Sequence, residues 1–453
     1  MSEKNLFKNF QNVSTEEWLL QIEKDLKGKD FNSLLKKSKE GISIKPVYHQ
    51  EAIPKSQGLR KERQWKIVQE MLVMDNKQAN KEALIHLNKG ATSLLFYLAC
   101  PIDLETLLNQ IQIQHISIHF VTEGNGMQVL NALKVLAQKR GLEEEEIAGS
   151  INIDCLENLS RTGNWFQSQE KDFEELKTLN QSTLRNLKSI CVNANLFSHA
   201  GASQAQELGL ALAMAYENIV QLELKESSSF WFNFGIGSDF FGEISKLRAF
   251  RRLWDQLQTE LNLKPHQANI YAETSLRNKT ILDAHNNLIR STTEAMAAII
   301  GGCDEFSVKP FNVAFDEPND FSERISKNQQ SILQHESHLE AVNDIAKGSH
   351  FIESYTEELA EKAWEFFKEI EKRGGYLEAL KTNWIQDQVE AVADTEQEKF
   401  NKNEKILIGA NKHRNKEDEI QEKIRFGLFY KEAKGEKTVR PLKVKRLSEE
   451  LEK

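Results

Sequence analysis

Histidines, the most common metal ligands and general bases, are spread through this 453-residue sequence, and only one pair attracts attention. His115 and His119 are separated by Ile116, Ile118 and Phe120, and this alternation is typical of a β-strand. Residues four apart on a strand point to the same face but lie about 13 Å apart, which is too far to share one metal ion. We therefore expect no metal site at this pair.

The cysteines Cys100, Cys155, Cys191 and Cys303 form no Cys-x-x-Cys pair and have no zinc-type spacing with histidine. Cys100 and Cys191 lie in or at the end of apolar runs. We interpret the four as reduced cysteines, mostly in the core of a cytosolic protein. The sequence also lacks the Gly-x-Ser-x-Gly pattern of a nucleophile elbow.

Two glycine pairs could bring backbone amides close to a ligand. Gly235-Ile236-Gly237 follows a predicted strand and precedes a predicted helix, a context in which amides can bind phosphate. The third glycine of a dinucleotide fingerprint is missing, so we favour a tight turn that needs positive φ. Gly301-Gly302 follows a predicted helix over 292–300, and a glycine at the C-terminal end of that helix explains Gly301.

The elements that would position such residues alternate along the chain from about residue 90. Short apolar runs predict strands, and the longer stretches between them have the helical period, as in Ile244, Leu247, Trp254 and Leu257. Eight strand–helix units favour a parallel (β/α)8 TIM barrel, with a doubly wound open sheet as the alternative fold. The predicted strands are Ser93–Leu98, Ile116–Val121, Ser150–Ile153, Ser189–Ala194, Phe230–Phe234, Ile270–Thr274, Glu305–Val308 and a shorter one at Phe351–Ile352.

This pattern predicts three regions. Residues 1–85 form an N-terminal arm, residues 86–385 form the barrel, and residues 386–453 form a charged, polar C-terminal extension or flexible tail. A formal net charge of −9 argues against a phosphate-dominated binding protein such as a nucleic-acid binder. No run of about 18 apolar residues occurs, and the N-terminus has no apolar signal core. We therefore expect a cytoplasmic protein.

Residues Asp239–Trp254, DFFGEISKLRAFRRLW, resemble the methylmalonyl-CoA mutase family, in which an aromatic strand precedes DFFxEIxKLRAxRxLW. Three further segments resemble this family in the same order, and the resemblance covers roughly residues 15–380. They are Asn286–Ala295 with Gly301-Gly302, Phe315–Pro318 with Asp320–Gln330, and Gly348–Thr356 with Ala363-Trp364 and Gly374-Gly375.

The resemblance implies a TIM barrel that binds a coenzyme A thioester, followed in catalytic chains by a separate cobalamin domain. Adenosylcobalamin supplies the radical, and the barrel holds the thioester beside it and excludes water. The catalytic pattern places Asp-x-His-x-x-Gly in that second domain. Here about 70 polar residues follow the predicted barrel. The near match at Asp283-Ala284-His285 has Leu288 in place of the glycine and lies within the barrel, so we do not expect His285 to ligate cobalt.

A second departure concerns the segment after the fourth predicted strand. Catalytic chains resemble SGYHMQEAGA there, whereas residues 193–202 read NANLFSHAGA. The family tyrosine therefore falls on Asn195, and the histidine that hydrogen-bonds the thioester carbonyl falls on Leu196, which cannot donate. Losing one such donor costs on the order of 2.7–4 kcal/mol of barrier. His199 falls on a family glutamate, and we expect it to be a surface residue at the barrel mouth.

The resemblance thus implies the non-catalytic small (beta) subunit of a heterodimeric mutase. This chain alone would bind no cofactor, and its degenerate catalytic positions are Asn195 and Leu196. Adenosylcobalamin (B12) would belong to a homologous large (alpha) catalytic subunit, around which the arm and the tail would wrap. The alternative is the substrate-binding barrel of a split acyl-CoA mutase with a separate cobalamin-binding protein. A third hypothesis is an acyl-CoA-binding protein that has no mutase partner.

Overall fold

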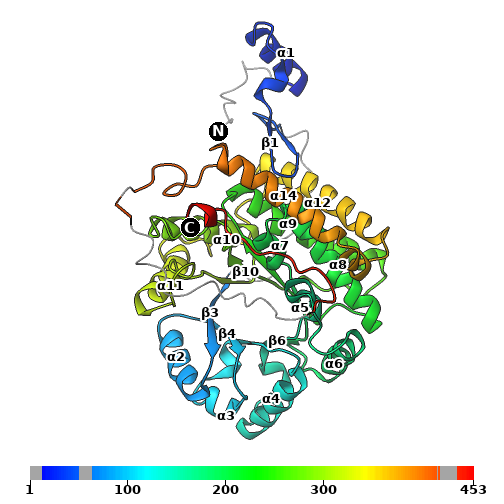
Figure 1. Cartoon of the computed structure of the whole chain (residues 1–453), viewed down its shortest axis with the longest axis vertical. Helices are drawn as coiled ribbons and strands as arrows, with labels where there is room; N and C mark the ends of the chain where they lie inside the picture. The colour runs from blue at the N-terminus through cyan, green and yellow to red at the C-terminus, as the bar shows by residue number, and fades with distance from the viewer. Residues whose placement is uncertain (1–12, 50–63, 416, 419–435, 453) are drawn as a thin grey trace, which may run out of the picture.

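The computed structural model describes residues 13–49, 64–415, 417–418 and 436–452 of the chain (Figure 1). Its centre is a ring of parallel strands surrounded by helices, which confirms the predicted (β/α)8 TIM barrel. The order around the ring is β7-β6-β5-β4-β3-β11-β10-β9-β8. The strands are β3 (Lys66–Val73), β4 (Ser93–Leu98), β5 (Ser117–Val121), β6 (Ala148–Asn152), β7 (Leu187–Lys188), β8 (Ile190–Asn193), β9 (Phe230–Ile236), β10 (Ile270–Thr274) and β11 (Glu305–Ser307).

The short strands β7 and β8 close the ring. A single residue, Ser189, separates them, and β7 pairs with β6 while β8 pairs with β9. They therefore act as one interrupted strand, and the ring has the eight strand positions of a (β/α)8 barrel.

The strand predictions are correct at seven positions and wrong at one. Phe351–Ile352 begins a long helix, because Ile352, Tyr355 and Leu359 recur at helical spacing and are buried on one side of it. The eighth strand is β3, which pairs with β11 and β4. Residues 66–85 therefore belong to the barrel and not to the predicted arm.

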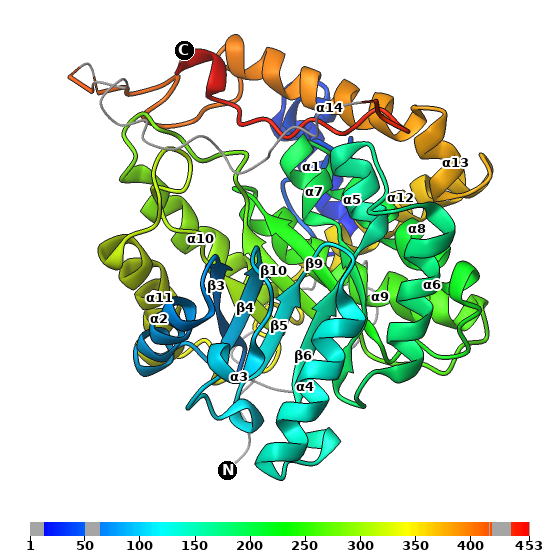
Figure 2. The same cartoon turned by 60° about the horizontal axis from the view of Figure 1, so that its bottom comes forward.

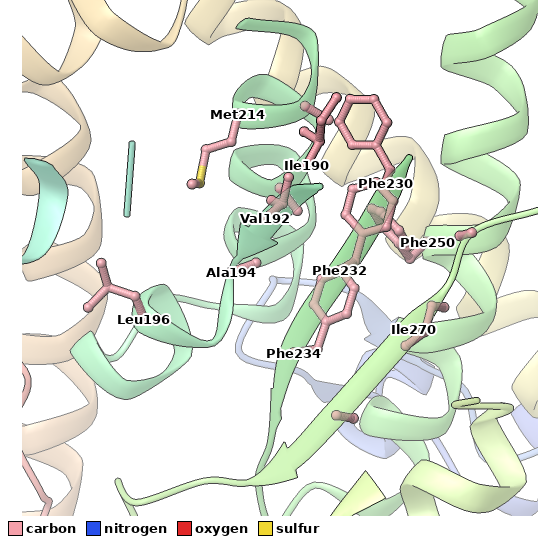
Figure 3. Packing of buried hydrophobic residues seen from close by; sticks show 14 of the residues in the cluster. Ile190, Val192, Ala194, Leu196, Met214, Phe230, Phe232, Phe234, Phe250 and Ile270 are labelled. Carbon is pink, nitrogen blue, oxygen red and sulfur yellow. The ribbon is translucent and has the colours of Figure 1, made fainter. Parts of the chain in front are cut away.

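The strand β9 shows why these segments form a closed, doubly covered sheet. All seven of its residues are buried. Phe230, Phe232 and Phe234 point outward, where Figure 3 shows them beside Phe250. Phe250 and Trp254 belong to one helix, α9 (Phe240–Glu260), and Phe230 and Phe232 also pack against Trp254. The residues between the phenylalanines of β9 face the barrel axis. Two apolar faces are expected for a parallel strand with helices on the outside and packed side chains on the inside.

The helices surround this ring in chain order, as Figure 2 shows for the side with β3 to β6. Side-chain caps begin many of them, including a capping box at Ser203 before α8. The helices are α1 (Thr15–Asp25), α2 (Asn76–Asn88), α3 (Leu104–Leu107), α4 (Gly126–Arg140), α5 (Cys155–Thr162), α6 (Gln169–Ser182), α7 (Asn195–Ala200), α8 (Gln204–Leu222), α9 (Phe240–Glu260), α10 (Asn286–Gly301), α11 (Asp320–His335), α12 (His350–Glu371), α13 (Tyr376–Lys381) and α14 (Trp384–Asn401). Among the described helices, none combines the length and the apolar character needed to cross a membrane.

The N-terminal arm, described over residues 13–49, projects from one end of the molecule (Figure 1). Its helix α1 has a capping box at Ser14 but no buried residue. An antiparallel hairpin of β1 (Lys36–Lys37) and β2 (Ser43–Ile44) connects α1 to the body. The tip of this hairpin contacts the barrel, and Tyr48 after it contacts His350 and Phe351 of α12.

Two described parts of the C-terminal region pack against the barrel, whereas the sequence predicted a charged, polar tail. Helix α14 buries Ile385, Val389 and Phe400. Residues 436–452, here called the C-terminal strap, run beside α14 above the carboxyl ends of the strands (Figure 2). The strap buries Val439, Leu442 and Leu447. The correction has a simple physical cause: apolar residues at intervals among the charged ones bind both segments to the barrel.

Candidate functional site

The carboxyl ends of the strands form the mouth of the barrel, where TIM-barrel proteins place their sites. Two acids and one base meet there. Nζ of Lys309, just after β11, lies 2.5 Å from Oε2 of Glu70 on β3 and 3.0 Å from Oε2 of Glu273 on β10. The hydroxyl groups of Tyr97 and Tyr271 donate to Glu70 at 3.1 and 2.8 Å. We call Glu70, Glu273 and Lys309 the acid–lysine cluster.

The electrostatics of the cluster favour a charged Lys309 and a charged Glu70. Burial alone would lower the pKa of Lys309, but Glu273 and Glu70 outweigh it and hold that pKa well above its usual range. Burial would raise the pKa of Glu70, but Lys309 keeps it below its usual value. The pKa of Glu273 is raised by burial, which Lys309 only partly offsets. A single lysine thus serves two buried carboxylates.

Sequence reasoning missed this cluster. Its members lie on three elements, and Glu70 and Lys309 are separated by 239 residues. The available signal was a polar residue inside or directly after a strand that is otherwise apolar. Successive side chains of a strand point to opposite faces, so every second residue of a barrel strand faces the barrel axis.

Large side chains fill the barrel below the cluster. Trp231 and Tyr271 stack with ring centroids 4.9 Å apart, and His119 lies 5.3 Å from Trp231. Val68, Leu95 and Cys191 complete this inner layer, and each is buried. The axis therefore holds packed side chains at the level where β3, β4, β8, β9 and β10 meet.

The lower end of the barrel holds a second polar group around His119. Its Nδ1 lies 2.8 Å from Oγ of Ser150, and its Nε2 lies 2.8 Å from Oε2 of Glu305. Burial would raise the pKa of Glu305, but His119 and other donors outweigh it and lower that pKa to about 2. His115 lies in a 3-10 turn before β5, not on the strand as predicted, so the two histidines do not share a strand face. Among the described residues, no group of three potential ligands could hold a metal ion.

The structure places Asn195 and Leu196 at the start of α7, beside the mouth but in different environments. Nδ2 of Asn195 donates to Oε1 of Glu273 at 3.0 Å, so Asn195 binds to the acid–lysine cluster. Leu196 is 2% exposed and belongs to the main hydrophobic core (Figure 3). Its side chain therefore has a packing role in this chain.

His199 is not the surface histidine that we expected. It is 1% exposed, and its Nε2 lies 3.6 Å from Oε1 of Glu273. Burial and the nearby Lys309, Lys279 and Lys246 lower its pKa to about 3, so its ring is neutral at physiological pH. The ring lies between β10 and β9, because its Nε2 is close to Glu273 and would lie 3.5 Å from a Cβ at Gly235. The strap contacts the backbone of the same residue, since the N–H of Lys445 donates to the carbonyl of His199.

The two glycine pairs singled out in the sequence have different structural roles from those that we expected. Gly235 and Gly237 do not have the positive φ that we expected. A Cβ at Gly235 would lie 2.9 Å from Oγ of Ser198, so glycine allows α7 to approach β9. In the second pair, Gly302 and not Gly301 forms the left-handed cap of α10, with φ of 90°.

The charged residues of the stretch Asp239–Trp254 are structural in this fold. Lys246 is fully buried and lies 2.7 Å from Glu207 and 2.6 Å from Glu243. Arg248 pairs with Asp344 and Glu353, and so connects α9 to the start of α12. These charged residues therefore hold the helices of the barrel together.

A family model described as methylmalonyl-CoA mutase matches residues 96–453. The chain belongs to the methylmalonyl-CoA mutase family. It is 34% identical to the methylmalonyl-CoA mutase small subunit of Porphyromonas gingivalis, over 99% of this chain and 77% of that protein. Two other members of the family are also similar. They are the small subunit of Streptomyces virginiae (31% identity; 77% of this chain, 58% of that protein) and the large subunit of Propionibacterium freudenreichii subsp. shermanii (30% identity; 69% and 44%).

The chain covers only part of the length of each of these relatives. The chain spans about three quarters of the Porphyromonas gingivalis small subunit but 58% of the Streptomyces virginiae small subunit. It spans less than half of the Propionibacterium freudenreichii large subunit. Methylmalonyl-CoA mutases are isomerases, and this chain shares their barrel scaffold.

Proposed function

We propose that this chain is the non-catalytic small subunit of an adenosylcobalamin-dependent methylmalonyl-CoA mutase. It would support a homologous large subunit that interconverts (R)-methylmalonyl-CoA and succinyl-CoA. Two relatives that carry the name small subunit support this assignment. The chain would act as a heterodimer partner in the cytoplasm.

The burial of Leu196 carries the proposal. In the catalytic pattern this position supplies a histidine that donates to the thioester carbonyl. Leucine has no donor, and here its side chain is buried in the hydrophobic core. The neighbouring Asn195 is held by Glu273. Leu196 could then not stabilise charge that develops on a substrate oxygen, and one donor of Asn195 is already bound to Glu273.

The filled barrel axis supports the same proposal. A thioester in the mouth would have to displace or bypass the acid–lysine cluster, whose three charges are mutually paired. Below it, the stacked rings of Trp231 and Tyr271 leave little room for a ligand that enters along the axis. Removing Lys309 from this cluster would leave two buried carboxylates unpaired, which is costly.

The residues that the structure describes include no histidine placed as the cobalamin pattern requires. Adenosylcobalamin, when bound to an enzyme, supplies a radical through its cobalt–carbon bond. The near-match histidine, His285, immediately precedes α10, and its ring stacks on Phe311 with centroids 5.4 Å apart. We therefore assign the cofactor to the large subunit, and we derive no catalytic step for this chain.

The N-terminal arm is the part of the chain best suited to hold a partner. Helix α1 carries two acids in its first turn and exposes Leu20, while none of its residues is buried against the barrel. Its Trp18 contacts His49 of the same arm. An amphipathic helix that leaves apolar side chains exposed gains stability when another chain covers them. The arm would contact the large subunit through this helix.

The test is mutase activity with methylmalonyl-CoA and adenosylcobalamin. This chain would be assayed alone, with its large homologue, and with a small cobalamin-domain protein, with the mass of each sample measured by size-exclusion chromatography and light scattering. An inert chain alone and an active one-to-one complex with the large homologue would support the small-subunit role. Turnover with only the cobalamin-domain protein would overturn it and favour the split acyl-CoA mutase.

A further inference from the structure

A single carboxylate joins four segments that are far apart in the sequence. Oε2 of Glu396 on α14 lies 3.3 Å from Nζ of Lys39 in the arm hairpin and 2.8 Å from Nε of Arg277 after β10. Its other oxygen lies 3.6 Å from Nζ of Lys405. Arg277 in turn donates from Nη1 to the carbonyl of Lys445 in the C-terminal strap at 2.9 Å. We call Lys39, Arg277 and Glu396 the Glu396 junction.

The arm side of the junction is built from the tip of the hairpin. Nζ of Lys39 also donates to the carbonyls of Gly201 and Ala202, at 3.2 and 3.3 Å, where α7 ends. The next residue, Glu40, accepts the backbone N–H of Gln204 at the start of α8 and the hydroxyl of Tyr355. A carboxylate at a helix N-terminus is favourable. The tip is therefore fixed at the same place on the mouth where α7 turns into α8.

The strap side depends on the same arginine. The backbone N–H of Leu447 donates to the carbonyl of Arg277 at 2.9 Å, and Nε2 of Gln397 on α14 donates to the carbonyl of Leu447. Gly201 allows this approach, because a Cβ there would lie 2.7 Å from both Cζ of Arg277 and Cβ of Ala393. Arm, mouth and strap are thus connected through Arg277 and Glu396.

We propose that the Glu396 junction couples the arm to the strap, so that withdrawal of Lys39 loosens the strap over the barrel mouth. When Lys39 leaves, Glu396 loses one of the cations that hold α14 at the mouth, and the carbonyls of Gly201 and Ala202 lose their donor. The end of α7 and α14, between which Arg277 reaches the strap, are then less firmly fixed. A partner that binds the arm and withdraws Lys39 would in this way loosen the strap without contacting the barrel mouth. That last consequence rests on the proposed function, whereas the coupling itself is a property of the isolated chain. Coupling between two sites is reciprocal, so loosening the strap must also loosen the hairpin.

The experiment is hydrogen–deuterium exchange, read by mass spectrometry, on the full chain alone. Lys39→Ala should speed exchange at least about five-fold in peptides that cover residues 36–44 and also in peptides that cover residues 445–447. Lys37→Ala is the matched control, because Lys37 is an exposed residue of the same hairpin. This control should leave the strap at its original rate.

The reciprocal variant is Leu442→Ala. Leu442 is buried in the strap, and its N–H binds the carbonyl of Ser160, so it does not belong to the junction. It should speed exchange in the hairpin as well as in the strap, and the double variant should be non-additive. If Lys39→Ala prevents folding, Lys39→Met replaces it. Faster exchange in the hairpin alone, or in neither segment, would overturn the coupling. Because no partner is present, a failure here is distinct from a failure to form the heterodimer.

Discussion

Nδ2 of Asn195 donates to Oε1 of Glu273 at 3.0 Å, while the other oxygen of this carboxylate lies 3.0 Å from Nζ of Lys309. Glu273 thereby connects α7 to the ion pair that closes the barrel mouth. The residue at the family tyrosine position thus stabilises a buried charge of its own chain. This position of the fold therefore contributes to the stability of the barrel mouth.

Lys309→Met should destabilise the protein by about 3–5 kcal/mol, because it leaves Glu70 and Glu273 buried without their cation. Urea denaturation at pH 7 measures the free energy of unfolding. The control is Lys139→Met, which removes a surface pair with Glu105 and should cost at most about 1 kcal/mol. Equal losses in the two variants would show that the cluster contributes no more than a surface pair.

Leu196→His, which restores the residue of the catalytic pattern, should not create activity. The imidazole would enter a packed core, and burying a polar group without partners destabilises by about 1–3 kcal/mol. The variant is compared in urea denaturation with Leu196→Met, which conserves volume and should cost less than about 1.5 kcal/mol. Turnover by Leu196→His with a cobalamin-domain protein would contradict the packing role.

Most strands could be predicted, because their apolar and β-branched runs are local signals. The strand β3 was missed because Gln69 and Glu70 interrupt its apolar pattern. The structure shows why they are tolerated: Gln69 accepts from Lys327, and Glu70 pairs with Lys309. These partners lie 258 and 239 residues away in the sequence, so no local pattern could reveal them.

The candidate site was predictable only where it follows a family motif. Alignment of residues 193–202 located Asn195 and Leu196, but it did not reveal that one binds Glu273 and the other enters the core. The environment of His199 was also hidden, because its ring lies against Glu273 of β10, a strand that follows it by more than 70 residues in the sequence. Long-range packing decides the chemistry of these positions.

The Glu396 junction should make stability depend on acid pH. Burial would raise the pKa of Glu396, but Lys39, Arg277 and Lys405 outweigh it and lower that pKa from 4.5 to about 2. A carboxyl with a depressed folded pKa contributes stability that is fully present above pH 4.5 and is lost as the pH falls toward 2. The contribution is on the order of 3 kcal/mol.

Urea denaturation of the native chain and of Glu396→Gln, between pH 6 and pH 3, measures this dependence. The difference in unfolding free energy should be largest near pH 6 and should shrink as the pH falls below about 4.5. Glu369→Gln is the control, since its carboxylate pairs at the surface with Lys372 and Arg373. A difference between the native chain and Glu396→Gln that stays constant over this range would mean that the junction does not depress the pKa of Glu396.

Gly163→Ala should detach the beginning of the strap from α5. Gly163 has φ of +84°, and its carbonyl accepts the N–H groups of Thr438 and Val439. A Cβ there would lie 2.6 Å from the carbonyl oxygen of Val439, so the strap must move. Gly141→Ala is the matched control, because Gly141 has φ of +66° with no atom within 4 Å of the added Cβ. Both variants carry the backbone strain of about 1–3 kcal/mol, but only Gly163→Ala carries the clash. Limited proteolysis should therefore cleave residues 436–447 faster in Gly163→Ala than in Gly141→Ala, whereas equal rates would mean that Gly163 does not position the strap.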